Sequence, residues 1–214
     1  MIDLYSWHTS NGRKVSIALE ELEIRYRVFP VDITQGEQKE RAFLGVSPNG
    51  KIPAIVDCDG GDLTLMESGA ILLYLAEKAG RLLPRSRERR WRAIEWLMWQ
   101  MGGVGPMLGQ HLHFSHYNPD ASEYARNRYA TEAQRLYAVL NHRLADHEYL
   151  ADEYSVADVA TWPWIARYPW QGIDLTVFPN VRRWYEKIAV RPAVQRCWRV
   201  PKNDDPIPLP GGRS

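Results

Sequence analysis

A change of sequence pattern near residue 85 limits what this chain can fold into. Before this point, short apolar runs typical of strands alternate with helical periodicity, whereas beyond it the apolar residues follow helical periodicity alone. The chain begins with a strand IDLY, a helix over residues 14–22 and a second strand YRVFPVDI. This order is the βαβ pattern of a parallel strand pair. We therefore expect an α/β domain followed by an all-helical domain.

The remaining elements follow the same division. In the first half we predict a helix over residues 38–44, the strands IPAIVD and DLTL, and a helix over residues 68–79 that Gly80 ends. In the second half we predict helices over residues 91–110, 121–144, 156–166 and 181–189. The expected domains are residues 1–80 and 88–200, with a proline- and arginine-rich linker over 81–87 and an irregular, proline- and glycine-rich tail over 201–214.

Charge and composition narrow the class of partner. The 214 residues carry 27 basic and 26 acidic side chains, a net charge of +1, so no excess of charge indicates nucleic acid or a membrane surface. The N-terminal residues MIDLYSWHTS lack the basic and long apolar stretches of a signal peptide, and no window is long and apolar enough to span a membrane. We expect a cytoplasmic protein whose partners are small molecules or proteins.

The turn HTSNG, between the first strand and the first helix, is rich in hydrogen-bonding groups. A helix N-terminus favours anions and thiolates, and Thr9, Ser10 and Asn11 can add hydroxyl and amide groups there. The turn itself contains no cysteine. The two cysteines of the chain, Cys58 and Cys197, are far apart and form no CxxC pair, so we interpret both as incidental thiols. A sulfur held by this turn must therefore come from elsewhere.

Two further motifs follow in the order strand, proline, strand, Glu-Ser, helix. A cis bond between Ile52 and Pro53 would turn the backbone and free the Ile52 N–H and C=O for a peptide-like ligand, although most bonds before proline are trans. Glu67 and Ser68 open the next helix, where the hydroxyl and backbone N–H groups can receive a carboxylate and Glu67 can take an ammonium. Each motif is common alone. Together they predict a grip on one α-amino-acid end and one peptide bond.

These motifs resemble those of cytosolic glutathione transferases. KIPAIVD and ESGAILLYLAEK are typical of the superfamily, while WQMGGVGPMLGQ and the early Thr-Ser-Asn are similar to the bacterial Nu class of glutathione-dependent disulfide-bond reductases. The resemblance covers nearly the whole chain, through QRLYAVLNHRL, YSVADVATWPW and RPAVQ. It implies the glutathione transferase fold, which is an α/β thioredoxin-like N-terminal domain followed by an all-α C-terminal domain, and it implies a homodimer.

The resemblance also implies which residues bind glutathione. By this carry-over, Glu67 and Ser68 hold the γ-glutamyl end, while Ile52 pairs with the cysteinyl backbone beside Pro53. Gln38 and Lys51 approach the glycine end. Arg128 reaches across a dimer interface to the ligand of the neighbouring subunit.

By the same resemblance, Thr9 and Asn11 surround the sulfur of glutathione, which supplies the thiol that the turn lacks. A free thiol has a pKa of ~8.5, and hydrogen bonds together with a helix N-terminus lower it. We rank Ser10 second, because serine activates the thiol in other classes. Tyr5 ranks third, because packing is the better interpretation of a tyrosine within a strand.

The expected reaction is thiol–disulfide exchange with reduced or oxidised glutathione as cosubstrate and small disulfides or electrophiles as substrates. Conjugation of glutathione to an electrophile uses the same thiolate and is the closest alternative. A non-catalytic adaptor with this fold is a second alternative, although such a protein would not need Thr9, Asn11, Ile52, Glu67 and Ser68 together.

Two polar motifs in the second half are interpreted as having no catalytic part. His111, His113 and His116 have no acidic or cysteine ligand beside them, so we expect no metal site. Ser155 and Asp158 match a variant of the capping box at the start of a helix. We assign Asp158 to folding.

Overall fold

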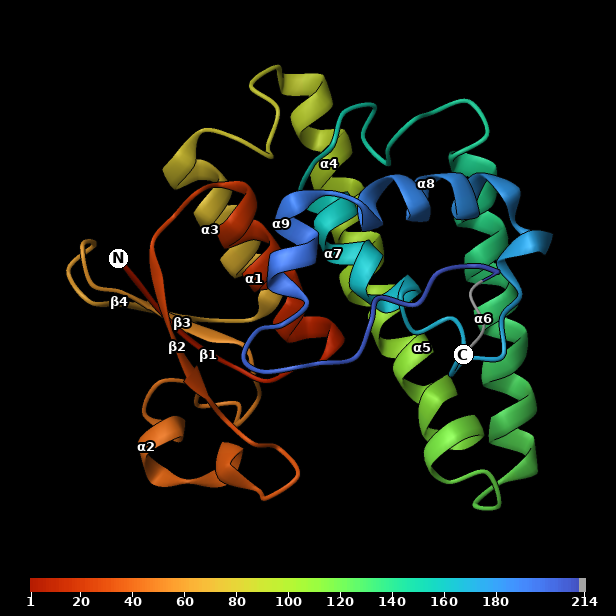
Figure 1. Cartoon of the computed structure of the whole chain (residues 1–214), viewed down its shortest axis with the longest axis horizontal. Helices are drawn as coiled ribbons and strands as arrows, with labels where there is room; N and C mark the ends of the chain where they lie inside the picture. Colours follow the sequence, from red (N-terminus) through yellow and green to blue (C-terminus); the bar gives the residue numbers. More distant parts are fainter. Residues whose placement is uncertain (212–214) are drawn as a thin grey trace. The chain divides into compact units, whose positions relative to one another are not determined.

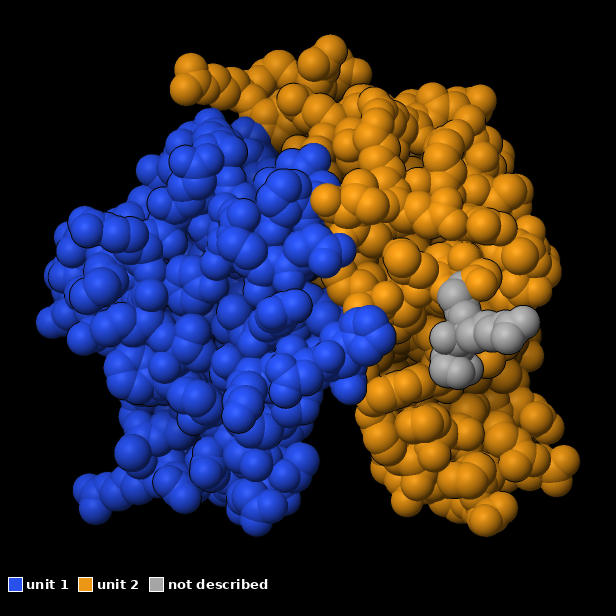
Figure 2. Space-filling model, in the orientation of Figure 1, with its two compact units in different colours: residues 1–83, 191–206 blue, residues 84–190, 207–214 orange. Residues whose placement is uncertain are grey.

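The computed structural model describes residues 1–211 and divides into two compact units. Unit 1 comprises residues 1–83 and 191–206, and unit 2 comprises residues 84–190 and the stretch that begins at Ile207 (Figure 2). The helical periodicity predicts one helical domain over residues 88–200. In the structure, the part of that range from Arg191 onward belongs to unit 1, because the last helix packs on the first one.

Unit 1 is built on a four-stranded mixed sheet with the strand order β2-β1-β3-β4. The strands are β1 (Ile2–Ser6), β2 (Tyr26–Pro30), β3 (Ala54–Asp57) and β4 (Leu63–Met66). β1 and β2 are parallel, as the βαβ pattern predicts, whereas β3 is antiparallel to both β1 and β4. β2 ends at Pro30 rather than at Ile33, because Asp32 accepts a hydrogen bond from the Thr34 N–H at 2.8 Å and turns the chain.

Helices lie on both faces of this sheet (Figure 1). They are α1 (Ser10–Glu21), the 3-10 turn η1 (Glu37–Lys39), α2 (Arg41–Leu44), α3 (Ser68–Ala79) and α9 (Pro192–Cys197). α1 and α3 pack together on one face, and α9 lies against α1. α2 lies on the other face, where Phe43 is buried with Val31 and Ala54. This arrangement confirms the predicted α/β unit, although α9 is too short for its periodicity to predict it.

α9 is held on α1 by charged side chains. Arg191 donates hydrogen bonds to both carboxylate oxygens of Glu21, at 2.6 and 2.9 Å. The guanidinium of Arg13, on α1, lies over the ring of Trp198 at 3.6 Å from its centroid. Such bidentate and stacked arginines fix geometry as well as contributing energy. The segment over residues 191–206 is therefore an integral part of the α/β unit.

Unit 2 contains helices and no β-strand among its described residues. Its helices are α4 (Arg87–Trp99), α5 (Gly105–Leu112), α6 (Glu123–Arg143), α7 (Val156–Ile165) and α8 (Pro179–Ala189), with the 3-10 turn η4 (Leu175–Val177). Two π-helical segments, η2 (Gln100–Val104) and η3 (His113–Tyr117), adjoin α5. The single helix predicted over residues 91–110 is thus interrupted. Pro106 explains this, because in a regular α-helix its ring would meet the carbonyl of Gly102.

α7 begins with the predicted capping box. Asp158 is fully buried, and its carboxylate accepts hydrogen bonds from the Ser155 N–H and the Leu150 N–H at 3.1 and 3.0 Å. The Trp184 indole, on α8, donates to the same carboxylate at 2.9 Å. Burial raises the pKa of Asp158 to about 6, although these donors favour the ionised form. The residue joins α7 to α8, and its contacts confirm the predicted capping box and support a folding role.

The C-terminal stretch is irregular as far as the structure describes it. Residues 201–211 form turns and no helix or strand, and the part of the predicted tail over 212–214 lies outside the described residues. None of the helices within residues 1–211 combines the length and the apolar composition needed to cross a membrane.

Candidate functional site

Strand register brings three sequence motifs to one edge of the sheet in unit 1. β1 ends just after Tyr5, which lies opposite Ala54, the first residue of β3. Ala54 in turn lies opposite Met66, the last residue of β4. The turn after β1, the Ile52–Pro53 bond before β3 and the Glu67–Ser68 pair after β4 therefore lie at the same edge. Residues far apart in the sequence form one candidate site in this way.

The turn HTSNG forms the N-terminus of α1. Thr9 is the N-cap, and its Oγ1 accepts a hydrogen bond from the Gly12 N–H at 3.1 Å. Because the hydroxyl accepts this bond, its own proton is available to an anion beyond the helix end. Ser10 is buried, whereas Thr9 and Asn11 are half-buried and more accessible to a ligand. A side chain on Gly12 would meet the Trp7 carbonyl oxygen at 2.2 Å, so the turn requires glycine there.

Tyr5, the third candidate for the sulfur site, packs within the α/β unit. Its ring stacks on Phe29 with the centroids 4.9 Å apart and lies 6.3 Å from the ring of Phe43. Burial and the nearby Asp3 raise the pKa of the phenol. These contacts support a packing role for Tyr5.

Neither cysteine lies at this edge of the sheet. Cys58 follows β3, and its N–H donates to the Met1 carbonyl at 3.1 Å, so it lies at the opposite edge. Cys197 is fully buried on α9, where its Sγ donates to the Val194 carbonyl at 3.2 Å. Burial raises the pKa of the Cys197 thiol, which makes it a poor nucleophile. A sulfur at the HTSNG turn therefore has to come from a bound molecule.

The start of α3 forms a second part of the site. Glu67 is its N-cap, with a φ of 69° that places a non-glycine residue in the left-handed region. The side chain of Glu67 is joined to the loop before β3 by the Asn49 amide, which donates to it at 3.4 Å. Ser68 is the first residue of the helix and is buried, and its hydroxyl accepts a hydrogen bond from the Lys14 ammonium at 3.3 Å. A helix N-terminus, a hydroxyl and an ammonium are together suited to a carboxylate.

The segment before β3 forms the third part of the site. The Ile52–Pro53 peptide bond is cis. The Oε1 atom of Gln38 is buried and has no hydrogen-bond partner among the described residues, which fits an N–H donor from a ligand. Gly50 lies beside Gln38, because a Cβ on Gly50 would be 3.3 Å from the Gln38 carbonyl oxygen. Lys51 is exposed, and its carbonyl accepts from the Ser47 hydroxyl at 2.9 Å. These residues suit the remaining part of a peptide-like ligand.

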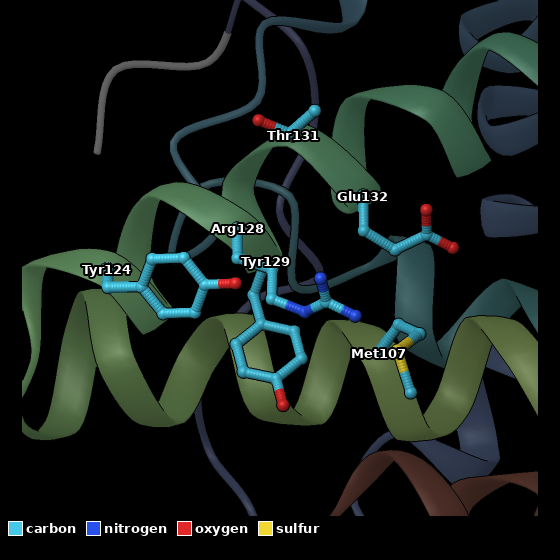
Figure 3. A pocket seen from close by; sticks show the side chains of 6 residues that line it. All are labelled: Met107, Tyr124, Arg128, Tyr129, Thr131 and Glu132. Atoms are coloured by element: carbon cyan, nitrogen blue, oxygen red, sulfur yellow. The ribbon is translucent and has the colours of Figure 1, made fainter.

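Arg128 lies in unit 2, where it lines an open hollow of about 590 Å³. The residues around the hollow come from α5 and α6 and are Met107, Tyr124, Arg128, Tyr129, Thr131 and Glu132. Figure 3 shows the Arg128 side chain extending from α6 toward Met107 on α5. Glu132 is engaged by Arg135 at 2.7 and 2.8 Å, while Arg128 has no hydrogen bond or ion pair within residues 1–211. Its guanidinium is therefore available to an anion from outside this chain.

The histidines of unit 2 have structural contacts. His111 is buried, with Nε2 2.9 Å from the Gln171 carbonyl and Nδ1 3.1 Å from the Ser115 hydroxyl. His113 and His116 are exposed. No group of three or more histidine, cysteine or acidic residues that could hold a metal is found in the part of the chain that the structure describes.

Lys14 is a site residue that the sequence motifs do not mark, and in the structure its ammonium donates a hydrogen bond to the Ser68 hydroxyl. The signal was present, because Lys14 precedes Ala18 by four residues and therefore lies on the apolar stripe of the predicted helix. A lysine at such a position either is exposed at the helix start or is buried beside groups that stabilise its ammonium. Here its side chain is only 1% exposed.

Both halves of the chain match known protein families. Residues 9–78 match the glutathione S-transferase N-terminal domain, and residues 103–192 match the glutathione S-transferase C-terminal domain. The disulfide-bond oxidoreductase YfcG of Escherichia coli is 52% identical over 198 residues, which cover 90% of this chain and 92% of that protein.

Solved structures give the same result. A glutathione transferase from Pseudomonas putida, with one glutathione disulfide bound per subunit, superposes with a TM-score of 0.89 at 41% identity, covering 94% of this chain and 91% of that chain. A glutathione transferase from Burkholderia graminis, with two glutathione molecules bound per subunit, has a TM-score of 0.88 at 42% identity, covering 94% and 89%. The predicted fold class is confirmed by both comparisons.

Proposed function

This chain belongs to the glutathione S-transferase superfamily, and on that basis we propose that it is a glutathione-dependent disulfide-bond reductase. The observation that carries the proposal is that neither cysteine of the protein lies near the HTSNG turn at this edge of the sheet. A thioredoxin-like protein that reduces disulfides without its own thiol needs an external one. Glutathione supplies it, and its carboxylates and peptide bonds fit the other two parts of the site.

Binding uses the groups already described. Ser68 and the N–H groups at the start of α3 receive the γ-glutamyl carboxylate, and the Glu67 carboxylate receives the ammonium. The Ile52 backbone pairs with the cysteinyl residue next to Pro53, and Gln38 and Lys51 lie toward the glycine end. This orientation directs the cysteinyl sulfur to the N-terminus of α1.

The thiolate is stabilised at that terminus. The Thr9 hydroxyl donates its proton to the sulfur while its oxygen accepts the Gly12 N–H, and Asn11 adds an amide donor. The positive end of the α1 dipole favours the anion further. Together these groups lower the pKa of the bound thiol, so that more of it is ionised at neutral pH.

The reaction then takes two exchanges. The bound thiolate attacks one sulfur of a substrate disulfide, so that a new S–S bond to glutathione forms, the old S–S bond breaks and the departing thiolate takes a proton. A second glutathione thiolate attacks the mixed disulfide and releases the other substrate thiol with glutathione disulfide. Two glutathione molecules are oxidised for each disulfide reduced. No protein sulfur takes part.

Membership of the Nu class, a two-fold homodimer and a cytoplasmic location belong to the same proposal. Exposed apolar side chains on the helices of unit 2 support an interface, because Trp91 and Met98 on α4 are 61% and 48% exposed and Tyr124 on α6 is 74% exposed. In such a dimer, Arg128 would approach the glutathione of the partner subunit. The unpaired state of its guanidinium within residues 1–211 supports this role.

A coupled assay tests the proposed reaction. The protein is supplied with glutathione and bis(2-hydroxyethyl) disulfide, and the glutathione disulfide produced is followed by NADPH consumption with glutathione reductase. A parallel assay measures conjugation of glutathione to 1-chloro-2,4-dinitrobenzene. We expect disulfide reduction to be the faster reaction. Dominant conjugation would instead identify a conjugating transferase, and no turnover in either assay with intact glutathione binding would identify an adaptor.

A further inference from the structure

The side chain of Lys14 is buried between α1 and α3. It is 1% exposed, and its Nζ donates a hydrogen bond to the Ser68 hydroxyl oxygen at 3.3 Å. Burying an ammonium is costly unless it has partners that need its charge. One partner of the Lys14 ammonium is the Ser68 hydroxyl at the start of α3, where the proposed function places the γ-glutamyl carboxylate.

We propose that Lys14 is a positioning residue for the ligand carboxylate and that it acts through Ser68. The ammonium occupies a lone pair of the Ser68 oxygen, so the hydroxyl proton points away from Lys14, and in the ligand complex we assign it to the carboxylate. The charge of Lys14 also adds to the positive end of the α3 dipole. This inference rests on the proposed function, because it requires a carboxylate at Ser68.

The charges around Lys14 favour this coupling. Among the elements packed on α1, α3 presents Glu67, whose charge acts on Lys14. Arg191, the N-cap of α9, pairs with Glu21, and Arg196 on α9 pairs with Glu20, at 2.6 Å each. Cys197 on the same helix is buried. A bound carboxylate would therefore add its negative charge to that of Glu67 near the Lys14 ammonium.

Protonation of Lys14 should then depend on the ligand. Burial lowers the pKa of Lys14 from 10.5 to about 7, and Glu67 opposes the shift. In the empty site near neutral pH, only part of the molecules carry the charge. A bound carboxylate raises this pKa, so binding takes up a proton and the affinity falls as the pH rises above about 7.

Calorimetry with two ligands tests the proposal. S-methylglutathione is used because its sulfur does not ionise, and the comparison ligand is S-methylglutathione with a carboxamide in place of the γ-glutamyl α-carboxylate. The variants are Lys14→Met, Lys14→Arg, Ser68→Ala and the control Lys78→Met, which removes a lysine from α3 that pairs with Asp57. Melting temperatures are measured to check that each variant is folded.

The expected results separate charge from structure. Lys14→Met should bind S-methylglutathione roughly ten- to hundredfold more weakly at pH 6.5, as expected for loss of a charge-assisted contact, and should bind the carboxamide as the wild type does. The wild type should take up protons on binding at pH 7.5, measured in buffers of different ionisation enthalpy, and Lys14→Met should not. Lys14→Arg should keep the preference for the carboxylate at every pH, and Lys78→Met should match the wild type.

The possible failures are distinguishable. If the wild type does not bind S-methylglutathione, or if Ser68→Ala binds it unchanged, the proposed glutathione site is wrong. If the wild type binds S-methylglutathione and Ser68→Ala weakens binding, the glutathione site stands. If Lys14→Met then retains the carboxylate preference and the proton uptake of the wild type, only the role of Lys14 is overturned. Should Lys14→Met fail to fold, proton uptake by the wild type on binding S-methylglutathione is the deciding measurement. Absence of uptake between pH 6.5 and 8.5 contradicts the proposal.

Discussion

Thr9 accepts the N–H of Gly12 through its Oγ1 at 3.1 Å, so one hydroxyl closes the start of α1 and still has a proton to donate. The first task is structural and the second is chemical. A serine at this position can perform both tasks, whereas an alanine performs neither. Substitution can therefore separate capping from sulfur stabilisation when stability and rate are measured together.

We predict that Thr9→Ala and Asn11→Ala each lower disulfide turnover at pH 7 by roughly tenfold or more. This factor corresponds to the free energy of one hydrogen bond to a charged group. Loss of the cap should also cost Thr9→Ala ~1 kcal/mol of stability, and Thr9→Ser should restore both. The rate defect should shrink at alkaline pH, where the thiol ionises unaided. A lower thiol pKa also reduces nucleophilicity, so a pH series of kcat is the deciding measurement. Full turnover of both alanine variants at pH 7 would contradict the sulfur site.

The cysteines should be dispensable for turnover. Cys58→Ser combined with Cys197→Ala should keep disulfide reduction close to the wild-type rate, because neither thiol lies at the site edge of the sheet. Cys197→Ala removes a buried sulfur and should lower the melting temperature, so rates are compared well below it. An inactive but folded double variant would show that a protein thiol takes part.

Glutathione affinity should depend on the start of α3. Glu67→Gln and Ser68→Ala should each weaken binding by ~1.5–3 kcal/mol, because each removes a charge-assisted contact. Thr64→Ala is a suitable control, since Thr64 is exposed on the adjacent strand β4 and its hydroxyl bonds only to the Asp62 carbonyl within the described residues. Titration calorimetry with reduced glutathione measures all three. The assigned pocket is wrong if neither site variant differs from Thr64→Ala.

Lys14 should make the stability of the ligand-free protein depend on pH. The pKa of Lys14 is lowered by burial from 10.5 to about 7, so between these values the unfolded chain binds more protons than the folded protein. The contribution of Lys14 to stability is therefore complete above pH 10.5 and is lost as the pH falls through about 7. Urea unfolding from pH 6 to 9 should show that the wild type gains stability relative to Lys14→Met as the pH rises. Parallel curves would mean that Lys14 does not titrate in this range.

Asp158 should matter for folding and little for catalysis. Asp158→Ala leaves the buried Leu150 N–H, Ser155 N–H and Trp184 indole without their acceptor, which should cost about 3 kcal/mol or more. The folded fraction should keep the wild-type KM for glutathione. Denaturant unfolding and steady-state kinetics at low temperature check the two parts. A large change in KM with unchanged stability would reverse the assignment.

The order of elements could be predicted because hydrophobic periodicity is a local property of the sequence. The change from alternating strands and helices to helices alone near residue 85, and the capping box at Ser155, both appear in the structure as expected. The interruption of the helix after Trp99 could not be read from periodicity, since π-helical and α-helical turns present similar apolar stripes.

The composition of the site was predictable only in part. Glu67 and Ser68 stand at a helix start that the sequence marks, whereas α1 begins at Ser10, before the predicted helix over residues 14–22. The contact of Lys14 with Ser68 forms only when α1 and α3 pack together. The pairing of Arg191 with Glu21 joins residues 170 positions apart, which no local pattern predicts. Tertiary packing, not propensity, decides which buried charges meet.

The return of α9 to α1 has a consequence for biosynthesis. Unit 1 begins with the first strand, yet α9, which packs on α1, is made after residues 84–190 of unit 2. A ribosome-bound chain that has just completed α3 therefore lacks part of the packing of α1, the helix whose N-terminus is formed by the HTSNG turn. Domains usually fold in order as they leave the ribosome. In this protein the packing of α1 is completed only after residues 84–190 have been made, so the nascent chain acquires the complete proposed glutathione site only after the helices of unit 2 have been synthesised.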